Sequence, residues 1–326
     1  MELPPVSALI PCLNEEVFIT ACIKSILLGS YPVDRLEILV IDGGSKDKTL
    51  DLVKQLKQKF PQIRILNNPK KTVPAALNIG LEEAQHEHLV WLGAHATYDE
   101  HYIKNSVETL LNNNVSSVGG VITPVGRSFI GRAIALATKS KLAIGNAKYR
   151  YATSTQQVDT VFGGCWLKSN IINAGRFDES WTRNQDYELN TRLRERIGPI
   201  LLNPEIKCRY FCRDSLRDLA HQYFEYGFWR FRTLSKHPSS INVRVIAPPT
   251  LVITTFISLA ITPLIGISAL TPIAFYAFVC SINSLLLTIE NKNFLALPIL
   301  PFIFPCIHYS WGMGFLYSFI SHKKSN

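Results

Sequence analysis

A long stretch without charge in the C-terminal part places the strongest constraint on how this chain can fold. No charged residue occurs from Val245 to Ile289, and only two occur between there and Lys323. A helix of ~20 apolar residues crosses the hydrocarbon core of a bilayer, and soluble cores rarely contain so long a run without charge. We therefore expect transmembrane helices in residues 245–326, from two to four hydrophobic segments, with three as the main expectation.

Charges beside this stretch predict its orientation. Between Lys207 and Arg244 there are eight basic residues and three acidic ones. Lys and Arg accumulate on the cytoplasmic side of membrane spans, where they also contact anionic lipid. The N-terminus lacks the basic and apolar regions of a signal peptide, so the first part of the chain is expected to stay in the cytosol. We predict a multi-pass protein of the inner cell membrane, with a cytoplasmic N-terminal domain and a basic juxtamembrane segment at 207–244.

Composition excludes several other classes of protein. The chain has 326 residues, of which 47% are hydrophobic and 18% charged, and its formal net charge is +9. A chain this apolar is not intrinsically disordered. Basic and aromatic residues do not alternate before residue 200 as they do in a nucleic-acid-binding surface, so nucleic acid is not an expected partner. The seven cysteines form no C-x-x-C pair, which argues against a structural zinc site.

The first part of the chain alternates short apolar runs with amphipathic segments. Strands are expected at residues 6–10, 36–41, 63–66 and 89–92, and helices at about 15–28, 47–60 and 74–84. This alternation predicts an α/β domain over residues 1–206, with a mostly parallel sheet and helices on both faces. Ligands bind at the carboxyl ends of the strands in such sheets, so the polar residues that follow the strands are the candidates for chemistry.

Four polar clusters follow these strands or open a later helix. They are Pro11-Cys-Leu13-Asn14-Glu15-Glu16, Asp42-Gly-Gly-Ser45-Lys46-Asp47, Gly93-Ala94-His95 and Asn184-Gln185-Asp186-Tyr-Glu188-Leu-Asn190. Each cluster alone has a local explanation: the second is typical of a turn with a helix cap, and Asp186 of a first-turn carboxylate favoured by the helix dipole. Lys70 and Lys71, before the third helix, are candidate diphosphate contacts or simply solvated side chains.

Taken together and in this order, the clusters resemble those of the family 2 glycosyltransferases, which have the Rossmann-like GT-A fold. The resemblance covers residues 6–230 and is closest to the succinoglycan-biosynthesis, ExoA-like membrane glycosyltransferases. Those proteins carry a terminal hydrophobic part with a His-x-Ser-x-Gly-x-Gly element, here His308-Tyr-Ser-Trp-Gly312-Met-Gly314. This element either lines an acceptor groove or packs helices, and its small residues favour packing.

The resemblance implies roles for individual residues. Asp186 lies at the position of the family's catalytic aspartate, which implies a general base. The candidate residues for the nucleotide-sugar donor are Pro11, Leu13, Glu15, Asp42, Gly93, Ala94 and His95, with Lys71 as a candidate diphosphate contact. The positions that the resemblance assigns to the acceptor side are Gln222, Trp229 and Arg230.

One position departs from the family pattern. The family's metal motif is Asp-x-Asp, which in this subgroup resembles Asp-Ala-His, whereas this chain has Gly93-Ala94-His95. His95 is then the remaining metal ligand, and Mn²⁺ tolerates a nitrogen ligand better than Mg²⁺ does. The resemblance therefore implies a divalent cation, Mn²⁺ or Mg²⁺, although Gly93 removes the usual carboxylate.

These observations predict an inverting glycosyltransferase that moves a sugar from a nucleotide sugar, expected to be UDP-linked, to a lipid-linked saccharide or polysaccharide precursor at the membrane. A single base such as Asp186 removes the acceptor proton during in-line displacement. The alternative is a catalytically impaired scaffold subunit that has lost metal binding through Gly93. A glycosidase would need a second acid, and Glu188 is too near Asp186 in the sequence to face it. A nucleotidyltransferase would need a Gly-rich basic loop after the first strand, which this chain lacks.

Overall fold

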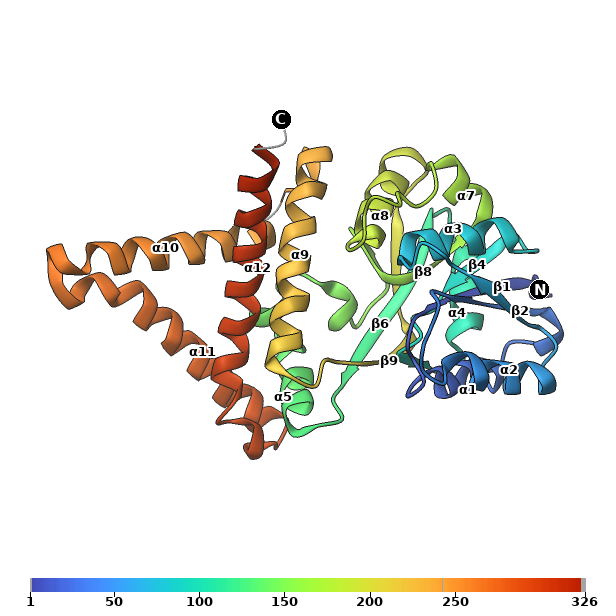
Figure 1. The fold of residues 1–326 in the computed structure, drawn as a ribbon, viewed down its shortest axis with the longest axis horizontal. Coiled ribbons are helices and arrows are strands. Elements are labelled where there is room, and N and C mark those ends of the chain that lie inside the picture. Colours follow the sequence, from blue (N-terminus) through green and yellow to red (C-terminus); the bar gives the residue numbers. More distant parts are fainter. Residues whose placement is uncertain (1, 242, 324–326) are drawn as a thin grey trace. The chain divides into compact units, whose positions relative to one another are not determined.

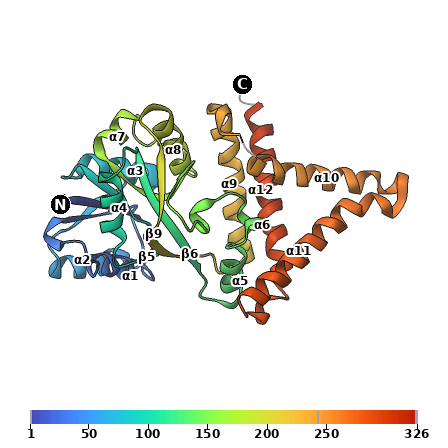
Figure 2. The same cartoon turned by 180° about the vertical axis from the view of Figure 1, so that it is seen from behind.

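The structure is a computed structural model that describes residues 2–241 and 243–323 (Figures 1 and 2). The chain divides into two compact units, one of residues 1–123 and 148–210, the other of residues 124–147 and 211–326. The segment 124–147 thus belongs to the same unit as the C-terminal helices. The separate acceptor segment expected at 207–244 stays a prediction. Residues 1, 242 and 324–326 of the expected segments lie outside the described residues.

The first unit is built on one mixed sheet with the strand order β3-β2-β1-β4-β8-β6-β9-β5. The four parallel strands are β1 (Val6–Cys12), β2 (Leu36–Asp42), β3 (Ile63–Asn67) and β4 (His88–Trp91). The others are β5 (Ala96–Tyr98), β6 (Ser117–Val125), β7 (Gln156–Val158), β8 (Phe162–Leu167) and β9 (Ile200–Phe211). Antiparallel pairs join β8 to β4 and β6, and β9 to β5 and β7. The expected α/β architecture is confirmed, with a sheet that is parallel only in its first half.

Helices cover both faces of this sheet. They are α1 (Ile19–Leu27), α2 (Thr49–Lys59), α3 (Val73–Glu83), α4 (Tyr102–Leu111), α7 (Lys168–Asn173) and α8 (Gln185–Arg196), with turns η1 (Val33–Arg35) and η2 (Lys148–Arg150). Successive side chains of a strand point to opposite faces. Ala8 and Ile10 of β1 accordingly pack with α1, α2 and α4, whereas Leu9 packs with α3, α7 and α8. These two apolar layers hold the carboxyl ends of β1, β2 and β4 at one edge of the sheet.

The second unit is helical. Its elements are α5 (Phe129–Ala137), α6 (Lys141–Ile144), α9 (Leu216–Lys236), η3 (Pro238–Ser240), α10 (Val243–Ile265), η4 (Gly266–Leu270), α11 (Thr271–Glu290), η5 (Phe294–Ala296) and α12 (Leu300–Lys323). Figures 1 and 2 show α9 and α12 side by side, while α10 and α11 leave this pair and meet at η4. Gly266, with φ of 72°, opens the turn η4 between α10 and α11.

Glycines bring the backbones of α9 and α12 into contact. A Cβ on Gly227 would lie 1.9 Å from the carbonyl oxygen of Trp311, and one on Gly314 would lie 2.0 Å from that of Phe224. A Cβ on Gly312 would lie 2.5 Å from the carbonyl oxygen of Pro248 in α10. Small residues permit this close approach of helices. The glycines of the C-terminal motif therefore pack helices, as the sequence favours.

Candidate active site

The loops that follow β1 and β2 are joined by hydrogen bonds. The N–H of Asn14 donates to Oγ of Ser45 (2.9 Å), and the N–H of Glu15 donates to Oγ1 of Thr49 (2.7 Å). These contacts hold the segment after β1 as a loop, so α1 begins at Ile19 rather than near Glu15, where the sequence predicts its start. The loop presents Glu15 at the carboxyl edge of the sheet.

Asp42 is buried at the end of β2 and shapes the turn that follows it. Its Oδ2 accepts hydrogen bonds from the N–H groups of Gly44 (2.8 Å) and Ser45 (3.0 Å), and its Oδ1 accepts one from the Ser45 hydroxyl. Cys12, its neighbour on β1, donates from Sγ to Oδ1 over 3.7 Å, and burial raises the pKa of that thiol. Asp42 therefore organises this loop, whatever it contributes to donor binding.

Pro11 and Leu13 lie on either side of Cys12. Pro11 is paired with Ile41 in the parallel ladder between β1 and β2. Leu13 is 42% exposed, and a Cβ on Gly43 would lie 3.5 Å from its side chain. An exposed apolar side chain thus covers the start of the turn after β2.

Gly93, Ala94 and His95 connect β4 to β5. Ala94 is buried, and the carbonyl of Gly93 accepts a hydrogen bond from the Tyr98 hydroxyl (3.1 Å). Nδ1 of His95 lies 3.0 Å from Oε1 of Glu15. Two residues that the sequence assigns separately to the donor site are therefore in direct contact.

An aromatic cluster that the sequence analysis missed surrounds His95. The rings of His95 and Tyr210 meet edge to face at a centroid distance of 5.1 Å, and Tyr210 meets Phe162 in the same way at 5.5 Å. The Arg150 guanidinium lies 5.8 Å from the centroid of the Tyr210 ring. Phe162 and Tyr210 belong to β8 and β9, and no local signal in the sequence connects these strands to His95.

The two lysines before α3 have different surroundings. Lys71 has a left-handed backbone with φ of 58°, and a Cβ on Gly44 would lie 3.8 Å from its Cε. Lys71 thus lies beside the turn that Asp42 shapes. Lys70 forms an ion pair with Glu179 (2.6 Å), which lowers the pKa of that carboxyl. Of the two, Lys71 is the one next to the other predicted donor residues.

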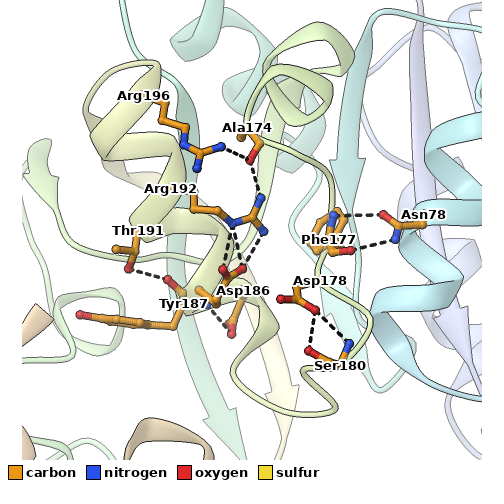
Figure 3. Close-up of polar contacts among 11 residues, drawn as sticks. Asn78, Ala174, Phe177, Asp178, Ser180, Asp186, Tyr187, Thr191, Arg192 and Arg196 are labelled. Atoms are coloured by element: carbon orange, nitrogen blue, oxygen red, sulfur yellow. Dashed lines mark hydrogen bonds and ion pairs between the residues drawn. The ribbon is translucent and has the colours of Figure 1, made fainter. Parts of the chain in front are cut away.

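Asp186 lies in the first turn of α8 (Figure 3). Asn184 precedes the helix with φ of 56°, a conformation that Asn tolerates better than most residues, and it turns the chain into α8. Oδ1 of Asp186 accepts a hydrogen bond from the N–H of Tyr187 (2.8 Å). Burial nevertheless raises the pKa of Asp186, because the charged form is poorly solvated. A carboxylate with a raised pKa is a stronger base.

The second carboxylate of α8 is not available for catalysis. Glu188 is fully buried and accepts hydrogen bonds from Arg192, at 2.9 and 3.0 Å from Nε and 2.6 Å from Nη2. Figure 3 shows the same guanidinium reaching the carbonyl of Ala174 (2.5 Å). A buried charge needs such a partner, because leaving it unpaired is strongly destabilising. Glu188 therefore belongs to an ion pair and does not supply the second acid of a glycosidase.

Comparison with known proteins identifies the family. The sequence model of the family described as glycosyl transferase family 2 matches residues 7–174. The chain belongs to glycosyl transferase family 2. It is 30% identical over 322 residues (95% of this chain, 97% of that protein) to a dolichyl N-acetyl-α-D-glucosaminyl phosphate 3-β-D-2,3-diacetamido-2,3-dideoxy-β-D-glucuronosyltransferase of Methanococcus voltae. It is 28% identical over 327 residues (99% of this chain, 98% of that protein) to the succinoglycan biosynthesis protein ExoA of Rhizobium meliloti.

A solved structure supports the GT-A fold of this glycosyltransferase. The mannosyltransferase PcManGT from Pyrobaculum calidifontis, solved in complex with GDP-Man and Mn²⁺, superposes with a TM-score of 0.62. The match covers 98% of this chain and 88% of that one at 17% sequence identity. The family and the fold that the sequence predicts are thus confirmed.

The predicted acceptor-side residues of this family 2 enzyme lie on α9, in the second unit. The Gln222 side-chain amide donates to the Tyr226 hydroxyl (2.8 Å). Trp229 and Arg230 are buried, and the Arg230 guanidinium donates to the carbonyl of Ser240 (2.7 Å). Trp229 and Arg230 thus contribute to packing within their unit, and an acceptor role for the three residues stays a prediction.

Within residues 2–241 and 243–323, no group of three or more His, Cys, Asp or Glu side chains could hold a metal ion. Asp99, at the end of β5, accepts a hydrogen bond from the N–H of His101 (3.3 Å) and is exposed. His95, with the Glu15 carboxylate beside it, stays the predicted protein ligand at the Gly93-Ala94-His95 segment. The remaining ligands would have to come from a bound diphosphate and water.

Proposed function

We propose that this glycosyltransferase moves a sugar from a UDP-linked donor to a lipid-linked saccharide or polysaccharide precursor, with inversion at the anomeric carbon. The observation that carries the proposal is Asp186, a carboxylate of raised pKa at the start of α8, in the unit that also holds the donor loops. The names of the Methanococcus and Rhizobium relatives, a dolichyl phosphate-linked saccharide in one and succinoglycan in the other, support this class of acceptor.

Asp186 acts as the general base in this proposal. Its carboxylate accepts the proton of the acceptor hydroxyl while that oxygen attacks the anomeric carbon, and the nucleoside diphosphate leaves from the opposite side. One base and one displacement invert the configuration. The ion pair of Glu188 with Arg192 supports a single-carboxylate mechanism, because it engages the only other acid of the first turns of α8.

The donor is held by the loops at the carboxyl ends of the parallel strands. Asp42 and Leu13 contact the nucleotide base, Glu15 the ribose, and Lys71 the diphosphate. Pro11 supports the first loop at the end of β1. Their common place at one edge of the sheet supports this assignment, since ligands of open α/β sheets bind there.

The residues at His95 fit a weakly held divalent cation. With Nδ1–H donating to the Glu15 carboxylate, Nε2 of His95 keeps its lone pair, which is the usual arrangement of a metal-binding imidazole and its carboxylate partner. His95 would hold the cation, and Gly93 and Ala94 would let the diphosphate approach the backbone. A bound cation supplies charge neutralisation for the departing diphosphate. Mn²⁺ is the better fit to a nitrogen ligand, and the Mn²⁺ of the Pyrobaculum enzyme supports this choice.

We place the reaction at the cytoplasmic face of the inner membrane. In the described part of the chain, Val245–Glu290 is the one stretch long and apolar enough to cross a bilayer, and most of its side chains are exposed. The basic residues of 207–244 support a cytoplasmic position for the adjoining segment. The acceptor would then be engaged by Gln222, Trp229 and Arg230 on α9.

The test is a donor screen with membranes that contain the protein. Membranes are given UDP- and GDP-sugars, Mn²⁺ and a lipid extract as acceptor, and the linkage of the product is determined by NMR. A β-linked product from an α-linked UDP-sugar, lost in Asp186→Asn but kept in the exposed control Asp51→Asn on α2, is expected. A product of retained configuration, or one made equally by Asp186→Asn, would contradict the proposal. Turnover only after Gly93→Asp would favour the scaffold alternative.

A further inference from the structure

The α10–α11 hairpin has the dimensions and the surface of a pair of membrane spans. α10 has 23 residues and α11 has 20, which correspond to about 34 and 30 Å, close to the ~30 Å hydrocarbon core of a bilayer. Large apolar side chains project from both helices, among them Phe256 (66% exposed) and Phe275 (67%). The tip of the hairpin is uncharged and exposes Ile267 (84%). Charged residues return at Glu290, where α11 ends.

α12 has a similar length but different surroundings. It has 24 residues and packs along α9 through the backbone contacts of Gly227 and Gly314. Aromatic contacts extend this packing: the Phe231 ring lies 5.6 Å from that of Phe319, and the Phe224 ring 5.9 Å from that of Tyr317. These contacts place the second half of α12 directly beside the middle of α9, so the two segments would lie at the same depth relative to a bilayer.

α9 carries charge along its whole length, so it does not lie in hydrocarbon. Its charged residues are Arg217, Asp218, Glu225, Arg230, Arg232 and Lys236. A charged side chain at the centre of a bilayer is strongly unfavourable, and six on one helix exclude a spanning position. Because α12 shares the level of α9, the same argument excludes a spanning position for α12, although α12 itself is apolar.

We infer that the chain crosses the bilayer only twice, through the α10–α11 hairpin, and that α9 and α12 form a two-helix layer at the membrane surface. The lack of charged residues alone favours three crossings, because it adds the uncharged stretch of α12 as a span. With two crossings, the C-terminal end of α12 lies on the same side of the membrane as α9. The inference rests on the membrane location proposed above and adds the lipid bilayer as the occupant of the exposed hairpin surface.

Sidedness distinguishes two crossings from three. A reporter that is active only in the cytoplasm and one that is active only outside it are fused, in separate experiments, after residue 326, and a single cysteine is introduced as Ser268→Cys in η4. We expect the C-terminal fusion to report the cytoplasmic side and Cys-directed impermeant maleimide to label the tip from outside. A C-terminal fusion that is active only outside would overturn the inference. Labelling of the tip only from the cytoplasm would overturn it as well.

A matched pair of charge substitutions tests which helix contacts hydrocarbon. Ile257 in α10 is 54% exposed and Met313 in α12 is 43% exposed, so lysine fits sterically at both positions. Ile257→Lys should lose most of the carbonate-resistant membrane fraction, whereas Met313→Lys should keep it. Equal loss in both variants, or loss in neither, would overturn the inference. Recovery of the wild-type chain as a soluble oligomer would show that a second copy covers the hairpin. That result would refute the membrane location but leave the transferase proposal to the Asp186→Asn assay.

Discussion

Nδ1 of His95 lies 3.0 Å from Oε1 of Glu15, although 80 residues separate the two in the chain. The contact joins the loop after β1 to the segment after β4, which are neighbouring parallel strands. The backbone N–H of Glu15 is bound to Thr49, which fixes the loop that carries the carboxylate beside the imidazole. In the proposed mechanism Glu15 is therefore a positioning residue for His95 as well as a donor contact.

Removing the Glu15 carboxylate should weaken metal binding without abolishing it. In Glu15→Ala the imidazole loses its orienting partner, and loss of such a partner usually lowers metal affinity by about 10–100-fold. Glu15→Gln keeps an acceptor for the Nδ1–H of His95, so it should lower the metal affinity much less. Mn²⁺ binding in the presence of UDP, followed by calorimetry, checks this, with exposed Glu16→Gln as the control. Unchanged Mn²⁺ affinity in His95→Ala would show that His95 is not a ligand.

Gly93→Asp should strengthen metal binding because the structure has room for the side chain. Gly93 is not among the residues of positive φ, and a Cβ there would lie 3.6 Å from the Phe162 ring, an ordinary contact. A tenfold fall in the Mn²⁺ concentration for half-maximal rate corresponds to about 1.4 kcal/mol. Gly93→Asn has nearly the same shape without the charge and should show no such fall. If both variants melt like the wild type and have the same metal dependence, the segment is not the metal motif.

The parallel half of the sheet and its loops could be predicted from the sequence. Strands buried on both faces appear as continuous apolar runs, such as Ile38–Ile41, and the turn residues after them mark the carboxyl edge. The expected strand boundaries agree with β1 to β4 to within two residues. The order of polar clusters was sufficient to place Glu15, Asp42 and His95 at one edge, because parallel strands bring their ends together.

The surroundings of His95 could not be predicted, since they depend on pairing across large sequence distances. Tyr210 reaches His95 because β9 pairs with β5, where Ala96 is opposite Tyr210. Phe162 reaches it because β8 pairs with β4. Neither β8 nor β9 has an apolar pattern that identifies its partner strand. The start of α1 was also misplaced, because the hydrogen bond from Glu15 to Thr49 competes with helix formation at that position.

The raised pKa of Asp186 should appear in the pH dependence of the rate. A general base must be deprotonated, so kcat/KM should fall with decreasing pH through a pKa above that of an ordinary aspartate. Asp186→Asn should lower the rate by a factor on the order of 10²–10⁴ while UDP affinity stays within a few-fold. The same variant should not melt at a lower temperature, because burial disfavours the charged form that it removes. An acid limb at the pKa of exposed carboxylates would contradict the role of Asp186.

Glu37 should make the first unit sensitive to acid. Burial opposes its ionisation, but hydrogen bonds from Ser7 (2.5 Å), the N–H of Gln85 (2.9 Å) and Arg64 (2.5 Å) outweigh burial and lower its pKa. A depressed pKa stabilises the fold above the unfolded-state value, and this contribution is lost as pH falls through the folded-state value. Glu37→Gln should therefore cost about 1.5–3 kcal/mol at pH 7 and progressively less toward low pH. Urea unfolding of the wild type and of Glu37→Gln across pH measures both free energies of unfolding, which should converge toward low pH. A difference that stays constant with pH would contradict this role of Glu37.

Gly227→Ala should separate α9 from α12. Alanine gains about 1 kcal/mol of helix propensity over glycine, which on its own would stabilise α9. The new Cβ would, however, lie 1.9 Å from the Trp311 carbonyl oxygen, and a backbone atom cannot turn aside as a flexible side chain can. Overpacking of this kind costs roughly 1–3 kcal/mol, so the steric effect outweighs the propensity. Ser235→Ala, at an exposed position on the same helix, is the control that raises helix propensity without a steric clash and removes only the hydrogen bond of the Ser235 hydroxyl to the Phe231 carbonyl (3.1 Å). We expect Gly227→Ala to melt at a lower temperature in detergent than Ser235→Ala, and α12 to become accessible to protease in it. Equal melting temperatures of the two variants would show that the backbones of α9 and α12 do not touch.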